Sequence, residues 1–217
     1  MTDANAGRER ILARLRAARA AAPLAPPPAP HAAGVFAPIA DPLVRFQEEC
    51  AANRTELYQV DAANAATCLG DLLAQALAPG DGAPAYVQDA PILRRLLAAL
   101  PPPLPARLRW SSEAAVGGDA GAAVTLAEAL VVRTGSILVS TACGGRAASV
   151  LAPVHIVYAE AAQLVPELDQ ALVAARACAA AASMLCLITG PSRTSDIEKK
   201  LVLGAHGPRR LVLLLAR

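Results

Sequence analysis

The chain of 217 residues carries a formal net charge of +2, and 55% of it is hydrophobic although only 3% is aromatic. This length suffices for one domain with a well-formed core and argues against two full domains, while the balanced charge argues against nucleic acid as the main ligand. No apolar run reaches the roughly 20 residues of a bilayer-spanning helix, and residues 1–22 lack the continuous apolar stretch of a secretion signal, so we expect no membrane span and a cytoplasmic protein.

An N-terminal arm precedes the main domain. In residues 7–22, Ile11, Leu12 and Leu15 fall on one helical face and arginines on the other, which predicts an amphipathic helix. Residues 23–34 then place five prolines within eight positions, a composition that excludes a helix interior and favours an extended linker. We therefore predict an arm of residues 1–34 and one α/β domain of residues 35–217.

Helix and strand patterns alternate along this domain. Asp41, which a proline follows, provides an N-cap for a helix to about residue 54, and Asp61 and Asp89 are expected to cap two further helices. A long alanine-rich helix is expected at 160–182, with Pro166 in its first turns or at its true start. Strands are expected at 55–60, 84–88, near 108, and at 124–140, 154–160, 183–189 and 209–215.

This alternation predicts an α/β fold with a mostly parallel central sheet flanked by helices. Thr134-Gly135 interrupts the strand pattern at 124–140 and predicts a tight antiparallel hairpin, inserted at one edge of the sheet. The continuous apolar run at 183–189 is typical of a strand that is covered on both faces.

The segment ITGPSRTSDIEKKLVLGAHGP, residues 188–208, concentrates polar side chains in a chain that is otherwise rich in alanine and leucine. Its Gly-Pro pair predicts a sharp turn at the carboxyl end of a strand, and Ser195 with Glu198 forms an S-x-x-E capping box for a helix. Donors at such a strand end suit a phosphate or carboxylate, which Arg193 can bind through two hydrogen bonds. A purely structural turn is the alternative, because Gly-Pro turns and capping boxes are common.

Other positions also have both a ligand-binding and a structural interpretation. His155 is either a general base or a histidine satisfied within the core, and Arg146, after two glycines, either helps to cradle an anion or follows a chain turn. His206 and Gly207 either join the site or belong to a helix C-cap. The candidate ligand-binding residues are Gly190, Pro191, Ser192, Arg193, Thr194, Ser195, His206, Gly207, Thr134, Gly135, Arg146 and His155.

The sequence lacks the ligand patterns of metal sites. Its five cysteines are an odd number, are widely spaced and include no C-x-x-C pair, which favours reduced thiols over disulfides, zinc or an iron–sulfur cluster. The common nucleophile, nucleotide-binding and zinc-protease signatures are also missing. We therefore expect no metal or cofactor in this chain, and its catalytic residues stay unassigned.

Four segments form a recognisable set: TGPSRTSDIEKKLVLGAHGPRRLVLLL (189–215), RTGSILVS (133–140), GGRAASVLAPVHI (144–156) and RFQEECAAN (45–53). Together they resemble the lactate utilization protein C family, the LUD-domain proteins, over about residues 35–217. The resemblance implies a fold similar to the sugar-phosphate isomerase and CoA-transferase class. Two positions depart from the family pattern: Arg133 stands where an acidic residue is usual, and Leu126 where a glycine is usual.

The resemblance also implies a component of a lactate-utilization system, which supports the oxidation of L-lactate to pyruvate. Separate partner proteins are expected to carry the iron–sulfur clusters, and we expect a small anionic ligand at the 190–195 turn. The alternatives are a free-standing enzyme that acts on a CoA, folate or sugar-phosphate substrate, by analogy of fold alone, and a non-catalytic scaffold whose N-terminal arm docks a partner.

Overall fold

The computed structural model describes residues 3–21, 36–77, 82–98, 100–141, 147–178, 182–194, 202–204 and 207–217. The chain divides into two compact units, Met1–Pro38 and Ile39–Arg217. The first unit holds helix α1 (Asp3–Ala21), which confirms the helix predicted there, and Ile11 and Leu15 on it are exposed. The proline-rich segment predicted as a linker lies outside the described residues.

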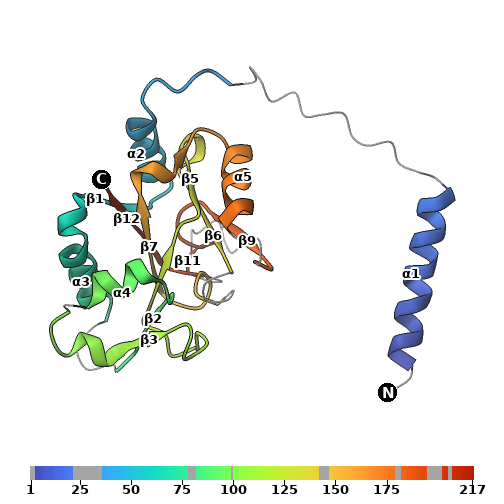
Figure 1. The fold of residues 1–217 in the computed structure, drawn as a ribbon, viewed down its shortest axis with the longest axis horizontal. Coiled ribbons are helices and arrows are strands. Elements are labelled where there is room, and N and C mark those ends of the chain that lie inside the picture. The colour runs from blue at the N-terminus through green and yellow to red at the C-terminus, as the bar shows by residue number, and fades with distance from the viewer. Residues whose placement is uncertain are drawn as a thin grey trace. The chain divides into compact units, whose positions relative to one another are not determined.

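A six-stranded sheet in which every neighbouring pair of strands is parallel forms the centre of the second unit. Its strand order is β1-β12-β7-β4-β2-β3, so that β7 and β4 occupy the middle (Figure 1). The strands are β1 (Glu56–Val60), β2 (Ala85–Val87), β3 (Leu108–Trp110), β4 (Ala122–Leu126), β7 (Val154–Glu160) and β12 (Arg210–Ala216). Parallel strands covered on both faces need continuous apolar sequences, which is why β7 and β12 are almost wholly buried.

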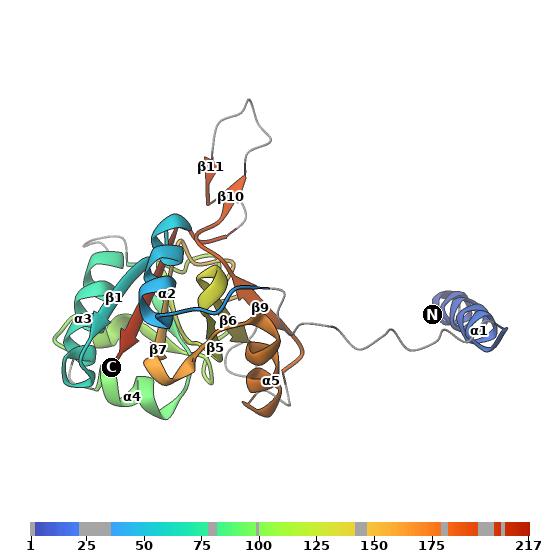
Figure 2. The ribbon, with the colours of Figure 1, turned by 90° about the horizontal axis from the view of Figure 1, so that it is seen from above.

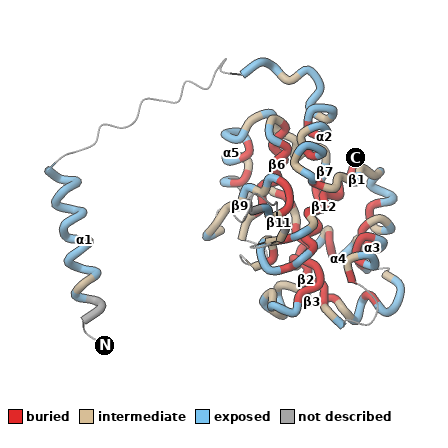
Figure 3. The backbone as a smooth tube through the Cα atoms, turned by 180° about the vertical axis from the view of Figure 1, so that it is seen from behind, coloured by how far each residue is buried: buried red, intermediate tan, exposed pale blue. Residues whose placement is uncertain are grey.

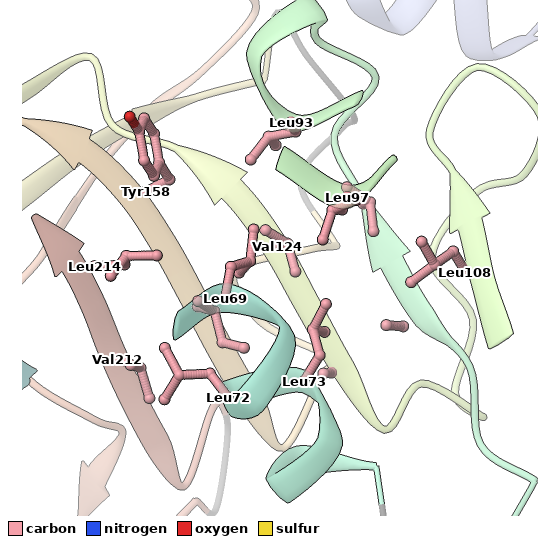
Figure 4. Close-up of a cluster of buried hydrophobic side chains, with 14 of the residues drawn as sticks. Leu69, Leu72, Leu73, Leu93, Leu97, Leu108, Val124, Tyr158, Val212 and Leu214 are labelled. Carbon is pink, nitrogen blue, oxygen red and sulfur yellow. The ribbon is translucent and has the colours of Figure 1, made fainter. Parts of the chain in front are cut away.

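Helices α3 (Ala65–Ala76) and α4 (Pro91–Leu97) cover one face of this sheet (Figure 4). Leu69 of α3 and Leu93 of α4 are fully buried and pack in one cluster with Val124 of β4. Burying one such leucine side chain contributes about 1.5–3 kcal/mol. The two helices are therefore held on the sheet mainly by apolar contact.

The opposite face carries helix α2 (Pro42–Ala52) and a second sheet of mixed direction, ordered β8-β5-β6-β9. Helix α5 (Leu168–Cys178) packs against this second sheet through Ala171 and Ala175 (Figure 2). The successive layers are α3 with α4, the central sheet, the second sheet and α5. The strands of the second sheet are β5 (Ala129–Val131), β6 (Ser136–Ser140), β8 (Leu164–Val165) and β9 (Leu185–Ile188).

Short elements connect these layers. The inner strands of both sheets are the most deeply buried parts of the second unit, and the edge strands and connections lie nearer the surface (Figure 3). A two-stranded antiparallel hairpin, β10 with β11, follows the turn after β9. The remaining elements are η1 (Ala62–Asn64), η2 (Leu104–Arg107), η3 (Val132–Thr134), η4 (Ala161–Gln163), β10 (Arg193–Thr194) and β11 (Val202–Leu203).

The predicted central sheet, mostly parallel and flanked by helices, is confirmed, and two predictions about its periphery are wrong. The antiparallel hairpin predicted at Thr134-Gly135 is confirmed as the pair β5 and β6. It lies inside the second sheet rather than at one edge of the central sheet, because β6 also pairs with β9. The apolar run at 183–189 forms β9, a partly exposed edge strand of that sheet rather than a strand covered on both faces. The helix expected at 160–182 begins at Leu168, which confirms the alternative that Pro166 marks its true start.

Of the three predicted helix caps, the structure confirms one, at Asp41. The Asp41 carboxylate accepts hydrogen bonds from the backbone N–H groups of Leu43 (2.9 Å) and Val44 (3.0 Å), as predicted. Asp61 makes no such bond. Asp89 is also not a cap, because Ala90 occupies the N-cap of α4 and the Asp89 carboxylate binds Arg94 instead.

We predict that Asp41→Ala lowers the free energy of unfolding by about 1 kcal/mol, because two backbone donors at the start of α2 lose their acceptor. Asp61→Ala is the matched control and should change that free energy by less than about 0.5 kcal/mol. Urea unfolding at pH 7 measures both. Equal losses in the two variants would mean that the Asp41 cap adds no stability.

Candidate functional site

Polar side chains gather at the carboxyl ends of β2, β3 and β4. β2 lies between the other two, so the chain runs from β2 to one side and returns on the other. In open α/β sheets, such a reversal of strand order leaves a crevice where ligands bind. Gln88 follows β2, Ser111 follows β3 and Thr125 is near the end of β4. All three line a cavity of about 10 Å³, and its other lining residues are Tyr86, Val87, Val116 and Ala148.

A second cavity of about 10 Å³ adjoins the first, because Thr125 and Ala148 line both. It lies between the central sheet and the second sheet, and its other lining residues are Val139, Ser140, Thr141, Ser149, Met184 and Cys186. We call the two cavities together the Thr125 crevice. Each has room for about one water molecule, so a larger ligand requires lining side chains to move.

Two side chains of the lining, Gln88 and Ser111, have hydrogen-bond donors that no described residue engages. The Gln88 side-chain carbonyl accepts a hydrogen bond from the backbone N–H of Leu126 (2.8 Å), and its NH₂ group has no partner among the described residues. The Ser111 hydroxyl oxygen accepts from the backbone N–H of Asp89 (2.9 Å), so its proton stays available. Both oxygens are thus fixed by backbone donors while N–H and O–H groups remain for a ligand.

His155 supports the floor of the crevice. It lies on β7, is completely buried, and places its Nε2 2.8 Å from the Thr125 hydroxyl oxygen. Its Nδ1 has no hydrogen-bond partner among the described residues. Burial lowers the pKa of His155 to about 4, because the charged ring would lose its hydration, so the ring is neutral at pH 7.

An ion pair ties the outer edge of this region together. The Nε and Nη2 groups of Arg94 donate to the two oxygens of the Asp89 carboxylate, which also accepts from the Ser112 hydroxyl. These bonds hold the pKa of Asp89 at about 2, and the Arg94 guanidinium lies 4.4 Å from the centre of the Trp110 ring. Both charges are therefore already engaged, and the pair joins the ends of β2 and β3 to α4 rather than offering a free cation.

Several of the predicted site residues meet elsewhere, over the C-terminal end of α2. The Thr134 and Ser136 hydroxyls lie 2.7 Å apart, and the Ser136 and Thr189 hydroxyls also lie 2.7 Å apart. The Asn53 amide donates to the backbone carbonyl of Thr134 (2.8 Å). Thr134, which precedes Gly135, and Thr189, which precedes Gly190, are thus brought together in a chain of hydroxyl groups.

The glycines of this second cluster have a packing role. Gly190 has φ +79°, and a Cβ there would lie 2.1 Å from the backbone carbonyl oxygen of Asn53. Gly135 has φ +61°, and a Cβ there would lie 2.7 Å from the side chain of Glu49. Only glycine permits both the conformation and the close approach. The C-terminal end of a helix is its negative end, so the contact with α2 works against an anion at Gly190.

The rest of the predicted 190–195 turn is partly described. Pro191 is buried, and the Ser192 backbone is tied to Pro208 and Gly204 by hydrogen bonds of 2.9 Å each. A Cβ on Gly207 would lie 3.1 Å from Ser192. Arg193 and Thr194 form β10, where Arg193 is exposed, and β11 occupies 202–203 in place of the end of the predicted helix. Ser195, Arg146 and His206 lie outside the described residues.

The Thr125 crevice is separate from the hydroxyl cluster of Thr134, Ser136 and Thr189. Ser136 begins β6 and belongs to the hydroxyl cluster, whereas Ser140 ends β6 and lines the Thr125 crevice. A five-residue strand spans about 13 Å between these positions. His155 therefore belongs with Thr125 and not with the 190–195 turn.

The two departures from the family pattern have structural explanations. The Arg133 guanidinium binds both carboxylate oxygens of Glu167, at 2.7 and 2.9 Å, and so joins η3 to the start of α5. Leu126 packs with the cluster under α3 and α4, so its side chain lies on the face opposite the crevice. Because the Arg133 guanidinium is engaged by Glu167, that side chain is not a candidate ligand-binding group of the hairpin.

Sequence reasoning missed Thr125, Gln88 and Ser111. The available signal was a polar residue directly after each of the short strands β2 and β3, and a threonine inside the apolar strand β4. What a sequence does not reveal is that these three strands are neighbours, because their order in the sheet differs from their order in the chain.

The described residues contain no group of three or more His, Cys, Asp or Glu side chains that could hold a metal ion. Burial, together with the nearby Glu49 carboxylate, raises the pKa of the Cys50 thiol to about 12, which makes this thiol a poor nucleophile and metal ligand. Among the described residues, no helix is both long and apolar enough to cross a membrane.

Comparisons with known proteins add a family context. A family model described as LUD domain matches residues 114–216, a range that includes Thr125, Ala148 and His155. Lactate utilization protein C of Bacillus pumilus is 32% identical over 117 residues, and the alignment covers 49% of each protein. Lactate utilization protein C of Bacillus subtilis is 28% identical over 193 residues, which cover 81% of this chain and 79% of that protein.

The coverage varies among these relatives. The chain spans about half the length of the first curated relatives that it matches, 49% and 45%. The crystal structure of a DUF162 family protein from Deinococcus radiodurans superposes with a TM-score of 0.58 at 20% identity, covering 83% of this chain and 100% of that one. This last likeness shows a shared fold.

We predict that His155 makes the protein less stable in mild acid. The folded-state pKa of about 4 lies below the ordinary value of 6.5, so between these pH values the unfolded chain binds the proton and the folded chain does not. The free energy of unfolding therefore falls as the pH drops through this window, by about 3 kcal/mol at most.

Urea unfolding of the wild type and of His155→Gln at pH 7 and pH 4.5 measures this contribution. The glutamine does not titrate, so the variant should lose less stability than the wild type between the two pH values. Equal losses would show that His155 is not held neutral by burial.

Proposed function

We propose that this chain, which belongs to the LUD-domain family, is a component of a lactate-utilization system and supports the oxidation of L-lactate to pyruvate together with separate iron–sulfur proteins. The alignment with lactate utilization protein C of Bacillus subtilis, over 81% of this chain, is the observation that carries the proposal.

The chemistry of the Thr125 crevice is consistent with this role. L-lactate and pyruvate are small acids rich in hydrogen-bond acceptors, and the crevice offers hydroxyl and amide donors at the strand ends where α/β proteins bind ligands. The 190–195 turn remains a second candidate place for an anion, through the exposed Arg193. The Thr125 crevice is the better candidate, because the turn packs on the negative end of α2.

The alternative of a free-standing enzyme on a CoA, folate or sugar-phosphate substrate has less support. Each of these molecules is much larger than the crevice, whose two cavities hold about 10 Å³ each. A small ligand demands the least rearrangement of the lining.

Deletion of the gene from the source organism tests the proposal. We expect the deletion strain to lose growth on L-lactate as the sole carbon source and to keep growth on pyruvate, since only the oxidation step is affected. A plasmid copy of the wild-type gene should restore growth on L-lactate. Undiminished growth of the deletion strain on L-lactate would contradict the proposal.

A tagged copy tests the partner part of the proposal separately. When this copy is purified anaerobically from cells grown on L-lactate, proteins that contain iron–sulfur clusters should accompany it. Purification of the chain alone from cells that need it for growth on L-lactate would show that it works without a stable complex.

A further inference from the structure

We propose that Thr125, Gln88 and Ser111 form a binding site for the carboxylate of a small 2-hydroxy or 2-oxo acid, and that His155 is a positioning residue that fixes the direction of the Thr125 hydroxyl. The choice of acid rests on the proposed function. The site itself rests on the geometry of the crevice and on the buried His155 imidazole, which makes one hydrogen bond, to Thr125.

The tautomer of His155 decides what Thr125 can do. A neutral ring carries one proton, on Nδ1 or on Nε2. A proton on Nδ1 would leave a buried N–H donor without a partner, and orphaned buried donors are rarer in proteins than under-used acceptors. The proton therefore belongs on Nε2, which donates to the Thr125 hydroxyl oxygen over 2.8 Å.

This assignment leaves the Thr125 proton free. With its oxygen occupied by the Nε2–H donor, the hydroxyl has no need to donate to the ring, and its own O–H is available to the crevice that Thr125 lines. The free Ser111 proton and the Gln88 NH₂ group line the same cavity. Three neutral donors from three neighbouring strand ends thus surround one small space.

The described residues that line the crevice are uncharged, and this indicates which class of anion the crevice can bind. No lysine or arginine lines the crevice among the described residues. Buried charge that lacks an opposite charge is costly, and the cost rises steeply with the charge, so neutral donors suit a monoanion far better than a doubly charged phosphate. A carboxylate accepts hydrogen bonds only, which matches a site that supplies donors.

Calorimetric titration of the full chain with L-lactate, with pyruvate and with inorganic phosphate tests the site. We expect the wild type to bind one of the two acids more tightly than phosphate. Thr125→Val, which keeps the shape and removes the hydroxyl, should weaken that binding by about 10- to 100-fold, the loss expected of one hydrogen bond to a charged group. Thr125→Ser keeps the hydroxyl and should bind nearly as the wild type does.

Two further variants separate positioning from folding. Thr67→Val makes the same change of side chain on the exposed face of α3, away from the crevice, and should leave binding unchanged. His155→Leu should weaken binding when Thr125 is present and cause no additional loss in the Thr125→Val background, because it acts through that hydroxyl. Melting temperatures show which variants are folded, and Thr125→Ser provides the comparison if Thr125→Val is not.

The outcomes distinguish this inference from the proposed function. If neither acid binds, or if Thr125→Val binds as the wild type does, the site is wrong even when the gene is needed for growth on L-lactate. If an acid binds in a Thr125-dependent way while the deletion strain still grows on L-lactate, the site stands and the proposed function fails. Tighter binding of phosphate than of either acid would overturn the ligand class.

Discussion

The burial of His155 is the interaction on which the candidate site depends. An imidazole without accessible surface must be neutral near pH 7, since a buried cation with no partner is too costly to keep. Its two ring nitrogens then present one donor and one acceptor, and Thr125 is the partner of one of them. This contact holds the Thr125 hydroxyl in one orientation. Beside it, the side-chain oxygens of Gln88 and Ser111 are fixed by backbone N–H groups, and the described lining residues carry no charge.

The segments that mark the family have two different physical roles. The turn around Gly190 and the hairpin around Gly135 meet over the end of α2, where two backbones approach too closely for any side chain. That contact fixes how the second sheet sits beside α2, and the hydroxyl chain through Ser136 reinforces it. The segment that ends in β7 has the other role, because it delivers His155 to the floor of the crevice. A long sequence signature therefore need not be a ligand site along its whole length.

The sequence predicted the central architecture well and the site only in part. Apolar runs and turn residues are local signals, so the parallel sheet and its helices could be foreseen, as could the cap at Asp41. The second sheet could not, because the pairing of β6 with β9 joins segments that are distant in the chain. Thr134 was named as a candidate site residue, but the sequence did not indicate that Ser136 and Thr189 link the hairpin to the turn. Thr125 was missed, because β-branched residues are common in strands and the sequence does not show that Thr125 contacts the buried His155.

The most direct test of this account is the protonation of the His155 ring, measured by ¹⁵N NMR on protein labelled at histidine. The chain has three histidines, and loss of one signal set in His155→Gln assigns the resonances. We expect a neutral ring with its proton on Nε2 and a bare Nδ1, unchanged from pH 7 down to about pH 5, since its pKa is about 4. A proton on Nδ1, or a ring already doubly protonated at pH 6, would contradict the account, because the Thr125 hydroxyl would then not be oriented toward a ligand.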